Sequence, residues 1–394
     1  MLLIQNLSLE NETVFIRCDF NVPLDDYGNI LDDRRIRETL PTIHYCLDQG
    51  CKIILASHLG RPKGKIDLRY SLLPVAKRLS RILNHEIIFS KDVIGKETQS
   101  KVSKLKNGEI LLLENLRFNP GESENDQDFA QKLAKLADFY INDAFGVSHR
   151  AHASVEAITH FFDKEHKGAG FLLQKEINFF HDVLQKPPHP FTLVVGGSKV
   201  STKLEALKHL LPEIDKMIIG GGMAFTFLKA LGFEIGNSIV EDDLLDGAKE
   251  IIKEAKQYKV KLFLPVDFII AKEIQQETKS RIVTYQDIPK EYMGVDIGPA
   301  TLKLFEEAVE KAKIILWNGP MGVFEIEKFS HGSFEFARFI ASLHATKIIG
   351  GGDTAEMIHH ANVMKNMTFV STGGGASLEL LSGKKLPGIR ALSV

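Results

Sequence analysis

The second half of the sequence repeats one local pattern four times: a short run of apolar, β-forming residues that breaks directly into glycines. In the clearest copy, residues 346–354 (TKIIGGGDT), three glycines precede an Asp and a Thr that can cap a helix. Glycine permits positive φ angles and lets an anion approach the N–H groups at the start of such a helix. The other copies are residues 191–199, 217–223 and 367–377. A strand that leads through a turn into a helix is typical of parallel α/β sheets.

One glycine turn alone is weak evidence for a binding site, because any tight turn between a strand and a helix can require glycine. Four such turns are harder to explain by packing. In an open parallel sheet they all lie at the carboxyl edge of the strands and converge on one crevice. We therefore predict a nucleotide phosphate site there, and Asp353 offers the oxygen ligand that Mg²⁺ prefers.

The strands of the first half end in charged, imidazole and amide side chains instead of glycine triplets. Arginine suits phosphate and carboxylate groups because its guanidinium makes paired, charge-assisted hydrogen bonds. For each arginine alone, a solvated surface position or a salt bridge is the more ordinary explanation. For His58, Asp19 and Asn21, a local turn explains the residue as well as a binding site does. Their repeated position near strand ends favours a site for a small, multiply anionic substrate. The residues concerned are Asp19, Asn21, His58, Arg61, Arg117, His149, Arg150 and His152, together with Arg34, Arg35 and Arg37 at the start of the first helix.

We predict two doubly wound α/β halves, joined by a helix and separated by a cleft. The joining helix is expected at 172–186, an amphipathic segment that ends at Pro187-Pro188. The expected domains are therefore 1–171 and 187–382. Predicted strands lie at 14–18, 52–56, 87–89, 109–113, 138–142, 191–195, 217–219, 261–264, 281–284, 314–317, 347–349 and 367–370, and helices near 36–48, 72–83 and 126–137.

Composition excludes several classes of function. The net charge of −2 gives no support for non-specific binding to nucleic acid or to an anionic membrane. No run approaches the ~18 uninterrupted apolar residues of a membrane span, and the start of the chain does not resemble a signal peptide. The three cysteines are odd in number and lack the spacing of a zinc site. We therefore expect a cytoplasmic protein.

A polyanion site in one half and a nucleotide site in the other predict transfer of a phosphoryl group. The P-loop sequence and the loops of protein kinases are absent. Such chemistry depends on alignment of the reactants and on cations and N–H donors around the transferred group. Lys199 and Lys203 follow Gly196-Gly197 four residues apart, so we expect them on one face at the start of a helix, within reach of a phosphate chain.

Two other classes of protein use similar parts. A nicotinamide dehydrogenase would also contain doubly wound halves, but it needs a G-x-G-x-x-G turn after its first strand, and none is present. A noncatalytic nucleotide-binding protein could keep the glycine turns while losing the chemistry. The joint presence of Arg35, Lys199 and Asp353 argues against that alternative.

Nine ordered motifs make the sequence resemble the phosphoglycerate kinases over essentially its whole length. They are RCDFNVP (17–23), SHLGRP (57–62), LENLRF (113–118), DAFG (143–146), HRAH (149–152), GGGMAF (220–225), WNGP (317–320), GGGDT (350–354) and STGGGAS (371–377). The resemblance implies reversible, Mg²⁺-dependent transfer of the acyl phosphate of 1,3-bisphosphoglycerate to ADP, which gives 3-phosphoglycerate and ATP in glycolysis. It also implies small-molecule partners only, and a monomer.

The resemblance assigns residues to each ligand. The triose substrate is expected on Asp19, Phe20, Asn21, Arg35, His58, Leu59, Gly60, Arg61, Arg117 and Arg150. The nucleotide is expected on Gly196, Lys199, Lys203, Gly220, Gly221, Asn318, Pro320, Val323, Glu325, Gly351, Gly352, Asp353 and Thr354, with the adenine near Val323 and the ribose near Glu325. The implied catalytic residues are Arg35, Lys199, Gly351 and Gly374, and the implied metal ligand is Asp353.

Further expectations accompany this resemblance. The family usually has Asp where this chain has Thr202, which affects any contact that the acid would make. The C-terminal segment, 383–394, is expected to return to the first domain. The two domains are expected to close on their ligands, with the joining helix and the C-terminal segment as hinge elements. We expect Arg34 on the solvated face of its helix, in contrast to Arg35.

Overall fold

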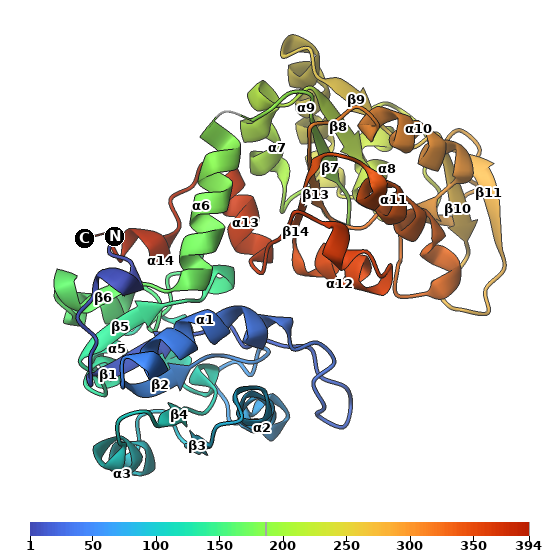
Figure 1. The fold of residues 1–394 in the computed structure, drawn as a ribbon. Helices are drawn as coiled ribbons and strands as arrows, with labels where there is room; N and C mark the ends of the chain where they lie inside the picture. Colours follow the sequence, from blue (N-terminus) through green and yellow to red (C-terminus); the bar gives the residue numbers. More distant parts are fainter. Residues whose placement is uncertain (186, 394) are drawn as a thin grey trace. The chain divides into compact units, whose positions relative to one another are not determined.

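The computed structural model describes residues 1–185 and 187–393 as two compact α/β units (Figure 1). Unit 1 comprises residues 1–181 and a C-terminal segment that begins at Lys385, and unit 2 comprises residues 182–384. The predicted last residue of the joining helix, Lys186, and the last residue of the chain, Val394, lie outside the described residues. Within the described part, no helix is long and apolar enough to cross a bilayer.

Unit 1 is built on a six-stranded parallel sheet in the order β3-β4-β2-β1-β5-β6. Except for β6, its strands are mainly apolar runs, as expected where helices cover both faces of a sheet. They are β1 (Thr13–Arg17), β2 (Lys52–Ala56), β3 (Ile87–Phe89), β4 (Ile110–Leu112), β5 (Phe139–Asn142) and β6 (Lys167–Ala169). The helices are α1 (Arg34–Asp48), α2 (Leu73–Leu83), α3 (Lys96–Lys104), α4 (Pro120–Ser123), α5 (Gln127–Ala134), α6 (Phe171–Gln185) and α14 (Pro387–Arg390).

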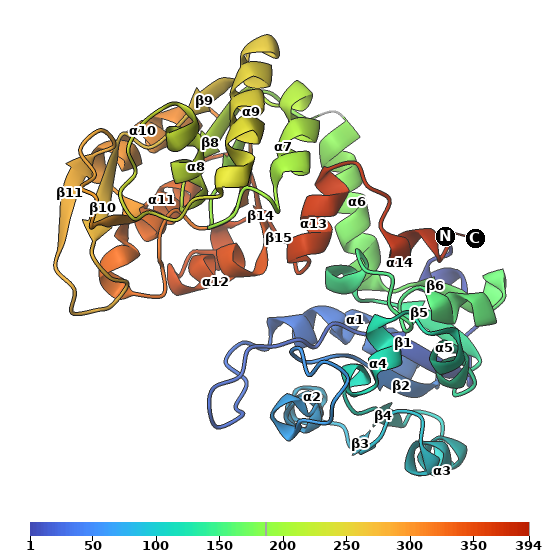
Figure 2. The ribbon, with the colours of Figure 1, turned by 180° about the vertical axis from the view of Figure 1, so that it is seen from behind.

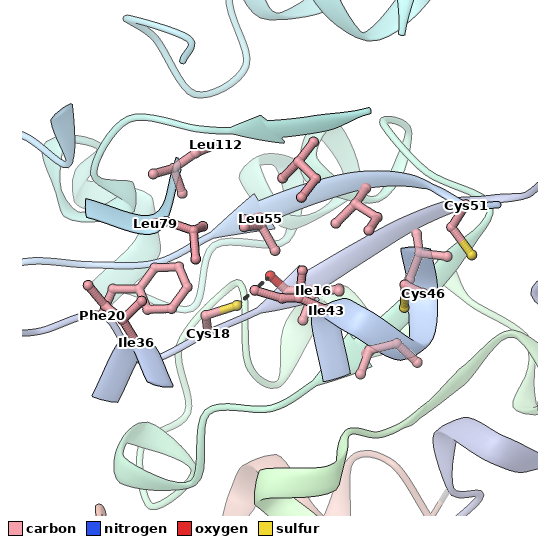
Figure 3. Close-up of a cluster of buried hydrophobic side chains, with 14 of the residues drawn as sticks. Ile16, Cys18, Phe20, Ile36, Ile43, Cys46, Cys51, Leu55, Leu79 and Leu112 are labelled. Atoms are coloured by element: carbon pink, nitrogen blue, oxygen red, sulfur yellow. Dashed lines mark hydrogen bonds between the residues drawn. The ribbon is translucent and has the colours of Figure 1, made fainter. Parts of the chain in front are cut away.

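The core of unit 1 fixes helix α1 against the sheet. Figure 3 shows Ile36, Ile43 and Cys46 of α1 facing Ile16 and Leu55 of the two central strands. These helix residues recur at intervals of seven and three positions, which places them on one face. The apolar contact holds the start of α1 beside the carboxyl end of β1. The cysteines of the chain are all free and buried, so they serve the packing of this core.

Unit 2 contains a second six-stranded parallel sheet, in the order β15-β14-β13-β7-β8-β9. Helices α7, α8, α9 and α13 form one layer and α10, α11 and α12 form the other (Figure 2). The strands are β7 (Phe191–Val195), β8 (Lys216–Ile219), β9 (Lys261–Phe263), β13 (Ile314–Asn318), β14 (Thr346–Gly350) and β15 (Phe369–Val370). The helices are α7 (Leu204–Leu210), α8 (Met223–Ala230), α9 (Leu245–Gln257), α10 (Pro299–Val309), α11 (His331–Ser342), α12 (Gly352–His360) and α13 (Gly374–Leu381). The prediction of two doubly wound α/β halves is confirmed.

A three-stranded antiparallel sheet in unit 2 differs from the prediction. It has the order β11-β10-β12 and consists of β10 (Asp267–Ala271), β11 (Ser280–Thr284) and β12 (Met293–Ile297). Only β11 was expected, as part of a regular strand and helix alternation. The sequence of β12 is a weak match to a strand pattern because it contains Gly294. Glycine is needed at this position, since an added Cβ would lie 2.1 Å from the ring of Phe225. A bulge between Ile269 and Ile270 further interrupts the pairing of β10 with β12.

The strand order reverses at one point in each parallel sheet. In unit 1 the chain crosses from one side of β1 to the other when it forms β5, so the order reverses between β1 and β5. In unit 2 the order reverses between β7 and β13. Open α/β sheets bind ligands outside the carboxyl ends of the strands at such a point. Most of the residues that the sequence analysis selected lie on loops after strands of these sheets, whereas Arg35 and Asp353 lie in the first turns of α1 and α12.

The C-terminal segment belongs to unit 1 and lies against the loop after β5. The amide of Gly388 donates to the carbonyl of Ser148 at 2.9 Å, and Nδ2 of Asn142 donates to the carbonyl of Gly388 at 3.4 Å. At Gly388 an added Cβ would meet a side-chain carbon of Val155 at 2.6 Å. The segment is therefore closely packed within this unit.

Helix α6 begins on a buried carboxyl group. Asp143 Oδ1 accepts from the amides of Leu172 and Leu173 at 2.9 and 3.2 Å. Burial raises the pKa of Asp143 to about 7. The pKa of Asp in an unfolded chain is about 3.9, so between these values the folded state binds more protons than the unfolded state. The contribution of Asp143 to stability therefore falls as the pH rises through this window.

We expect Asp143→Asn to remove this pH dependence, because the amide cannot ionise but can still accept from the helix N–H groups. One proton gained on folding gives a slope of up to about 1.4 kcal/mol per pH unit. Urea unfolding of both proteins at a series of pH values between 4 and 8 measures the difference. Parallel stability curves for the two proteins would contradict the assignment.

Candidate active site

Three charged or polar side chains meet at the carboxyl edge of the unit 1 sheet. Asp19 follows β1, and its Oδ2 accepts from Nη1 of Arg35, near the start of α1, at 2.5 Å. His58 follows β2, and its Nδ1 lies 3.8 Å from the other oxygen of Asp19. The structure thus brings together residues from three elements that are distant in sequence.

The loop after β2 is held by an amide and a guanidinium. Oδ1 of Asn21 accepts from the amide of Gly60 at 2.8 Å, and Nη1 of Arg117 donates to the carbonyl of Gly60 at 2.8 Å. Gly60 has φ +60°, and an added Cβ would lie 2.3 Å from the ring of Tyr70. Glycine is therefore required at this position. Nε of Arg117 is buried and has no partner in the described part of the chain, so a donor remains for a ligand.

Arginines dominate the electrostatics of this edge. Burial and the charge of Arg17 lower the pKa of Arg117 to about 10, so Arg117 stays charged at neutral pH. Burial and the same Arg17 hold the pKa of His58 well below its usual value. Burial and Arg117 lower the pKa of His152 to about 3. The site therefore combines positive arginines with neutral imidazoles, an environment that attracts an anion.

The remaining residues expected for the triose lie on the same loops. Phe20 and Leu59 precede Asn21 and Gly60, and their side chains are buried in the hydrophobic core of unit 1. Arg61 and Arg150 are exposed, and Nε of Arg150 lies 3.1 Å from Nε2 of His149.

In unit 2 the turns after β7 and β13 interlock. The amide of Gly196 donates to the carbonyl of Asn318 at 2.9 Å. The amide of Gly197 donates to the carbonyl of Pro320 at 2.8 Å. Gly319 has φ +100°, and an added Cβ would lie 2.3 Å from the carbonyl oxygen of Gly196. The glycines here allow two backbone turns to touch directly.

Lys203 lies beneath these turns, in contrast to the prediction. Its Nζ donates to the carbonyls of Gly196 and Asn318, the latter at 3.0 Å, and burial lowers its pKa to about 8. Lys199 is exposed. The two lysines precede α7, so the expected pairing on one helix face is wrong. Contacts with distant residues explain the difference. Buried carbonyls attract the Lys203 ammonium, and Glu241 accepts from the amides of Val200 and Ser201, between the two lysines.

Thr202 also lies in this turn. Its side chain is exposed, and its hydroxyl donates to the carbonyl of Lys199 at 3.2 Å. The hydroxyl therefore makes a local contact within the loop.

Two helix N-termini meet beside the interlocked turns. Gly351, with φ +95°, precedes α12, and Gly374 begins α13. An added Cβ on Gly374 would lie 3.4 Å from the amide nitrogen of Gly352. The amide of Gly319 donates to Oγ1 of Thr354 at 2.6 Å and ties the turn after β13 to this region. Helix N-termini attract anions, so this meeting point suits a phosphate.

An unsatisfied donor lies at the same place. Nδ2 of Asn318 is buried and has no hydrogen-bond partner among the described residues. It would lie 3.1 and 3.2 Å from a Cβ added at Gly350 and Gly351, so it is directed at the glycine turn. Buried donors are normally satisfied, which makes this one a candidate ligand contact.

Asp353 is exposed in the first turn of α12. In the described part of the chain, no three His, Cys, Asp or Glu side chains form a metal-binding group. Mg²⁺ is commonly held by one or two carboxylates together with substrate phosphates and water. A single carboxylate beside a phosphate-binding turn therefore fits Mg²⁺ bound together with a nucleotide.

The other residues expected for the nucleotide surround the loop after β13. The amide of Gly221 donates to the carbonyl of Met321 at 3.1 Å, and an added Cβ on Gly220 would meet Sδ of Met321 at 2.4 Å. Val323 is half-buried and Glu325 is exposed, both further along this loop. The structure thus places Gly196, Gly220 and Gly221 around one backbone segment.

The sequence analysis missed two residues beneath the unit 1 site. Arg17, at the end of β1, and Glu122, in α4, are fully buried and form an ion pair. A charged residue inside the apolar run VFIRC was the available signal for Arg17. Nothing in the local sequence marks Glu122 as its partner.

Comparisons with known proteins agree with this architecture. The family model described as phosphoglycerate kinase matches residues 4–384. A phosphoglycerate kinase from a Nitratiruptor species is 63% identical over 392 residues, covering 99% of this chain and 98% of the relative. One from Nautilia profundicola is 62% identical over 382 residues, covering 97% of this chain and 96% of the relative.

Two solved structures show the same fold. The phosphoglycerate kinase of Coxiella burnetii matches with a TM-score of 0.83 and 40% identity, covering 100% of this chain and 98% of the other. That of Pyrococcus horikoshii matches with a TM-score of 0.87 and 31% identity, over the same shares of the two chains. The chain belongs to the phosphoglycerate kinase family, glycolytic enzymes that transfer a phosphoryl group between 1,3-bisphosphoglycerate and ADP.

Proposed function

We propose that unit 1 binds the triose, 3-phosphoglycerate or 1,3-bisphosphoglycerate, and that unit 2 binds ADP or ATP. The observation that carries this division is the meeting of two helix N-termini with the unsatisfied Asn318 amide in unit 2. The described residues of unit 1 include no glycine triplet after a strand of its sheet, and the unit concentrates arginines at the sheet edge instead. Each half thus suits a different anion.

The triose site uses charge and hydrogen-bond donors from the loops of unit 1. Arg35, Arg61, Arg117 and Arg150 supply positive charge for the phosphate and carboxyl groups. Asp19 holds Arg35, and Asn21 holds the loop at Gly60 through the contacts described above. Phe20 and Leu59 anchor these loops to the core of unit 1 through their buried side chains.

In unit 2 the phosphates lie on the N-termini of α12 and α13, where Gly351 and Gly352 leave the backbone open and the buried Thr354 ties the turn after β13 to α12. Lys203 stabilises the turns from below, and Lys199 reaches the phosphates from the exposed loop. The adenine lies against Gly196, Gly220, Gly221, Pro320 and Val323, and Glu325 contacts the ribose.

Asp353 binds Mg²⁺ together with the nucleotide. A bound Mg²⁺ neutralises phosphate charge and orients the nucleotide for transfer. Around the transferred group, this chain supplies the guanidinium of Arg35, the ammonium of Lys199 and the N–H groups at Gly351 and Gly374. Donors and cations fixed in these positions stabilise the charge that spreads over the equatorial oxygens.

The two ligands must meet for the reaction. Near-attack geometry requires about 3–3.5 Å between the reacting atoms, and water must be excluded because it would hydrolyse an acyl phosphate. We therefore infer that the units close on their ligands. The enzyme acts as a monomer in the cytoplasm, which accords with its free, buried cysteines.

We expect Asp353→Ala to weaken binding of MgADP at least tenfold and to change binding of 3-phosphoglycerate by less than twofold. The lost charged contact is worth about 1.5–3 kcal/mol, and 1.4 kcal/mol corresponds to a factor of ten. Titration calorimetry with each ligand measures both constants. Glu356→Ala is the matched control, because Glu356 is an exposed carboxylate on the same helix. Equal losses for both ligands would contradict the division between the units.

We expect Gly319→Ala and Gly352→Ala to separate stability from binding. Gly319→Ala places a Cβ against the Gly196 carbonyl at a positive φ angle, which should destabilise unit 2 by about 3 kcal/mol or more. A Cβ on Gly352 meets nothing within 4 Å, so stability should be nearly unchanged while ADP binding weakens. Thermal unfolding measures the stability of both variants, and calorimetry measures their affinity for ADP. Full ADP affinity in a stable Gly352→Ala protein would rule out the proposed phosphate position.

A further inference from the structure

The buried ion pair beneath the triose site is held from several sides. Nη2 of Arg17 lies 3.7 Å from Oε1 of Glu122, and both side chains are fully buried. Ser154 connects the two, because its Oγ accepts from Nε of Arg17 at 2.7 Å and donates to Oε1 of Glu122 at 2.7 Å. The amide of Ser154 donates to the other Glu122 oxygen at 3.0 Å. The orientation of the Arg17 guanidinium is thus fixed.

The fixed guanidinium faces the imidazole of His58. Nη2 of Arg17 lies 3.4 Å from Nδ1 of His58. A guanidinium only donates hydrogen bonds, so Nδ1 has to be the acceptor and a neutral ring carries its proton on Nε2. No residue in the described part of the chain forms a hydrogen bond with Nε2. This N–H group therefore remains available to a ligand.

Asp19 acts in the opposite direction, because a carboxylate near Nδ1 favours a proton on that atom. Its Oδ1 is 3.8 Å from Nδ1, farther than Arg17, and its Oδ2 is engaged by Arg35. Burial, followed by the charges of the surrounding arginines, lowers the pKa of His58 and keeps the ring neutral. The charged or titratable groups around the ring are Arg17, Asp19, Arg35, Arg117, Glu122 and His152.

We propose that Arg17 and Glu122 are positioning residues that hold His58 as a neutral imidazole with its proton on Nε2, directed at an anionic oxygen of the triose. The inference rests on the proposed place of His58 in the triose site. The opposite tautomer would present a lone pair to the anion and repel it. Because the donor does not depend on protonation of the ring, binding through His58 stays constant across neutral pH.

The test replaces both charges together, because Arg17→Met alone would leave Glu122 buried without a partner. In the double variant Arg17→Met/Glu122→Gln, Asp19 becomes the closest charged group to Nδ1 and draws the proton there. Nitrogen NMR of the intact enzyme with ¹⁵N-labelled histidine reports the tautomer directly. We expect the wild-type His58 to carry its proton on Nε2 between pH 6 and 8, and the variant to carry it on Nδ1.

Kinetics supply a second readout. At pH 8 the variant should show a KM for 3-phosphoglycerate about tenfold higher, with a much smaller change in kcat. Loss of the Arg17 charge raises the pKa of His58, so lowering the pH adds a second proton on Nε2 and restores the donor. The KM of the variant should therefore fall with decreasing pH, whereas that of the wild type should not respond to His58.

Tyr140→Phe is the control for general loosening. Its hydroxyl donates to the carbonyl of Ser154 at 2.8 Å, so the variant loses a buried hydrogen bond nearby without touching the contact with His58. We expect lower thermal stability with an unchanged tautomer and KM. The same KM shift in Tyr140→Phe would overturn the proposal, as would a wild-type His58 protonated on Nδ1.

The NMR experiment also separates this inference from the site assignment. Addition of 3-phosphoglycerate should shift the His58 nitrogen signals if the ring contacts the triose. If wild-type His58 carries its proton on Nε2 but its nitrogen signals do not shift with 3-phosphoglycerate, the role of Arg17 in fixing the ring is supported. The place of His58 in the triose site is then refuted.

Discussion

Arg35→Ala should lower kcat by about 10³-fold or more while changing the Kd values of 3-phosphoglycerate and MgADP much less. Arginines that contact a transferred phosphoryl group contribute roughly 10³ to 10⁵ in rate in related chemistry. An interaction made mainly in the transition state lowers kcat and kcat/KM together when it is removed. Steady-state assays measure kcat, and calorimetry measures the Kd of each ligand, so the loss of turnover can be compared with the loss of affinity.

The structure changes the choice of control for this experiment. We expected Arg34 on the solvated face, but its side chain is 24% exposed, the same fraction as for Arg35, and burial lowers its pKa. Arg37 is the better control, because it is 54% exposed and pairs with Asp33 one turn away. Arg37→Ala should leave turnover nearly unchanged. A loss of triose affinity in Arg35→Ala that matches its loss of turnover would assign Arg35 to ground-state binding instead.

Removal of divalent metal should abolish phosphoryl transfer. Beside the N-termini of α12 and α13, the exposed carboxylate of Asp353 lies next to backbone N–H groups, and these groups leave much of the phosphate charge to be neutralised by a cation. We expect EDTA to eliminate activity in a coupled assay with 3-phosphoglycerate and ATP, and excess Mg²⁺ to restore it.

Two variants sharpen the metal experiment. Asp353→Asn should require a higher Mg²⁺ concentration for half-maximal activity, whereas Glu356→Gln, on the same helix, should not. Turnover at the full rate after complete chelation would exclude the proposed role of the metal.

The sequence predicted most of the two parallel sheets because nearly all of their strands are short apolar runs separated by helical segments. It did not predict β10 and β12 of the antiparallel sheet, where Gly294 and a bulge weaken the pattern. Nor did it predict β6, whose three residues, Lys167–Ala169, carry almost no β signal. These strands form because neighbouring strands provide partners, which is information that a local pattern does not contain.

The candidate site shows the same division between local and distant causes. Glycine turns and strand-end arginines are local features, so the parallel sheet alone was enough to predict that they converge. The burial of Lys203 depends on carbonyls up to 115 positions away in sequence, and the contact between Arg17 and Ser154 spans 137 positions. The spacing of two lysines could not reveal that one of them stabilises backbone turns from below.

The return of the C-terminal segment to unit 1 has a consequence for synthesis of the chain on the ribosome. Residue 181, the end of the main part of unit 1, and Lys385, the start of its final segment, are 204 positions apart (385 − 181). At about 5–20 residues per second, the ribosome needs roughly 10–40 s to make that stretch. During this time the nascent N-terminal unit lacks the strip that covers Ser148 and Asn142, while the whole of unit 2 is being completed. A segment translated after unit 2 therefore completes a unit translated before it, so that a chain released before residue 385 would contain all of unit 2 and lack the final segment of unit 1.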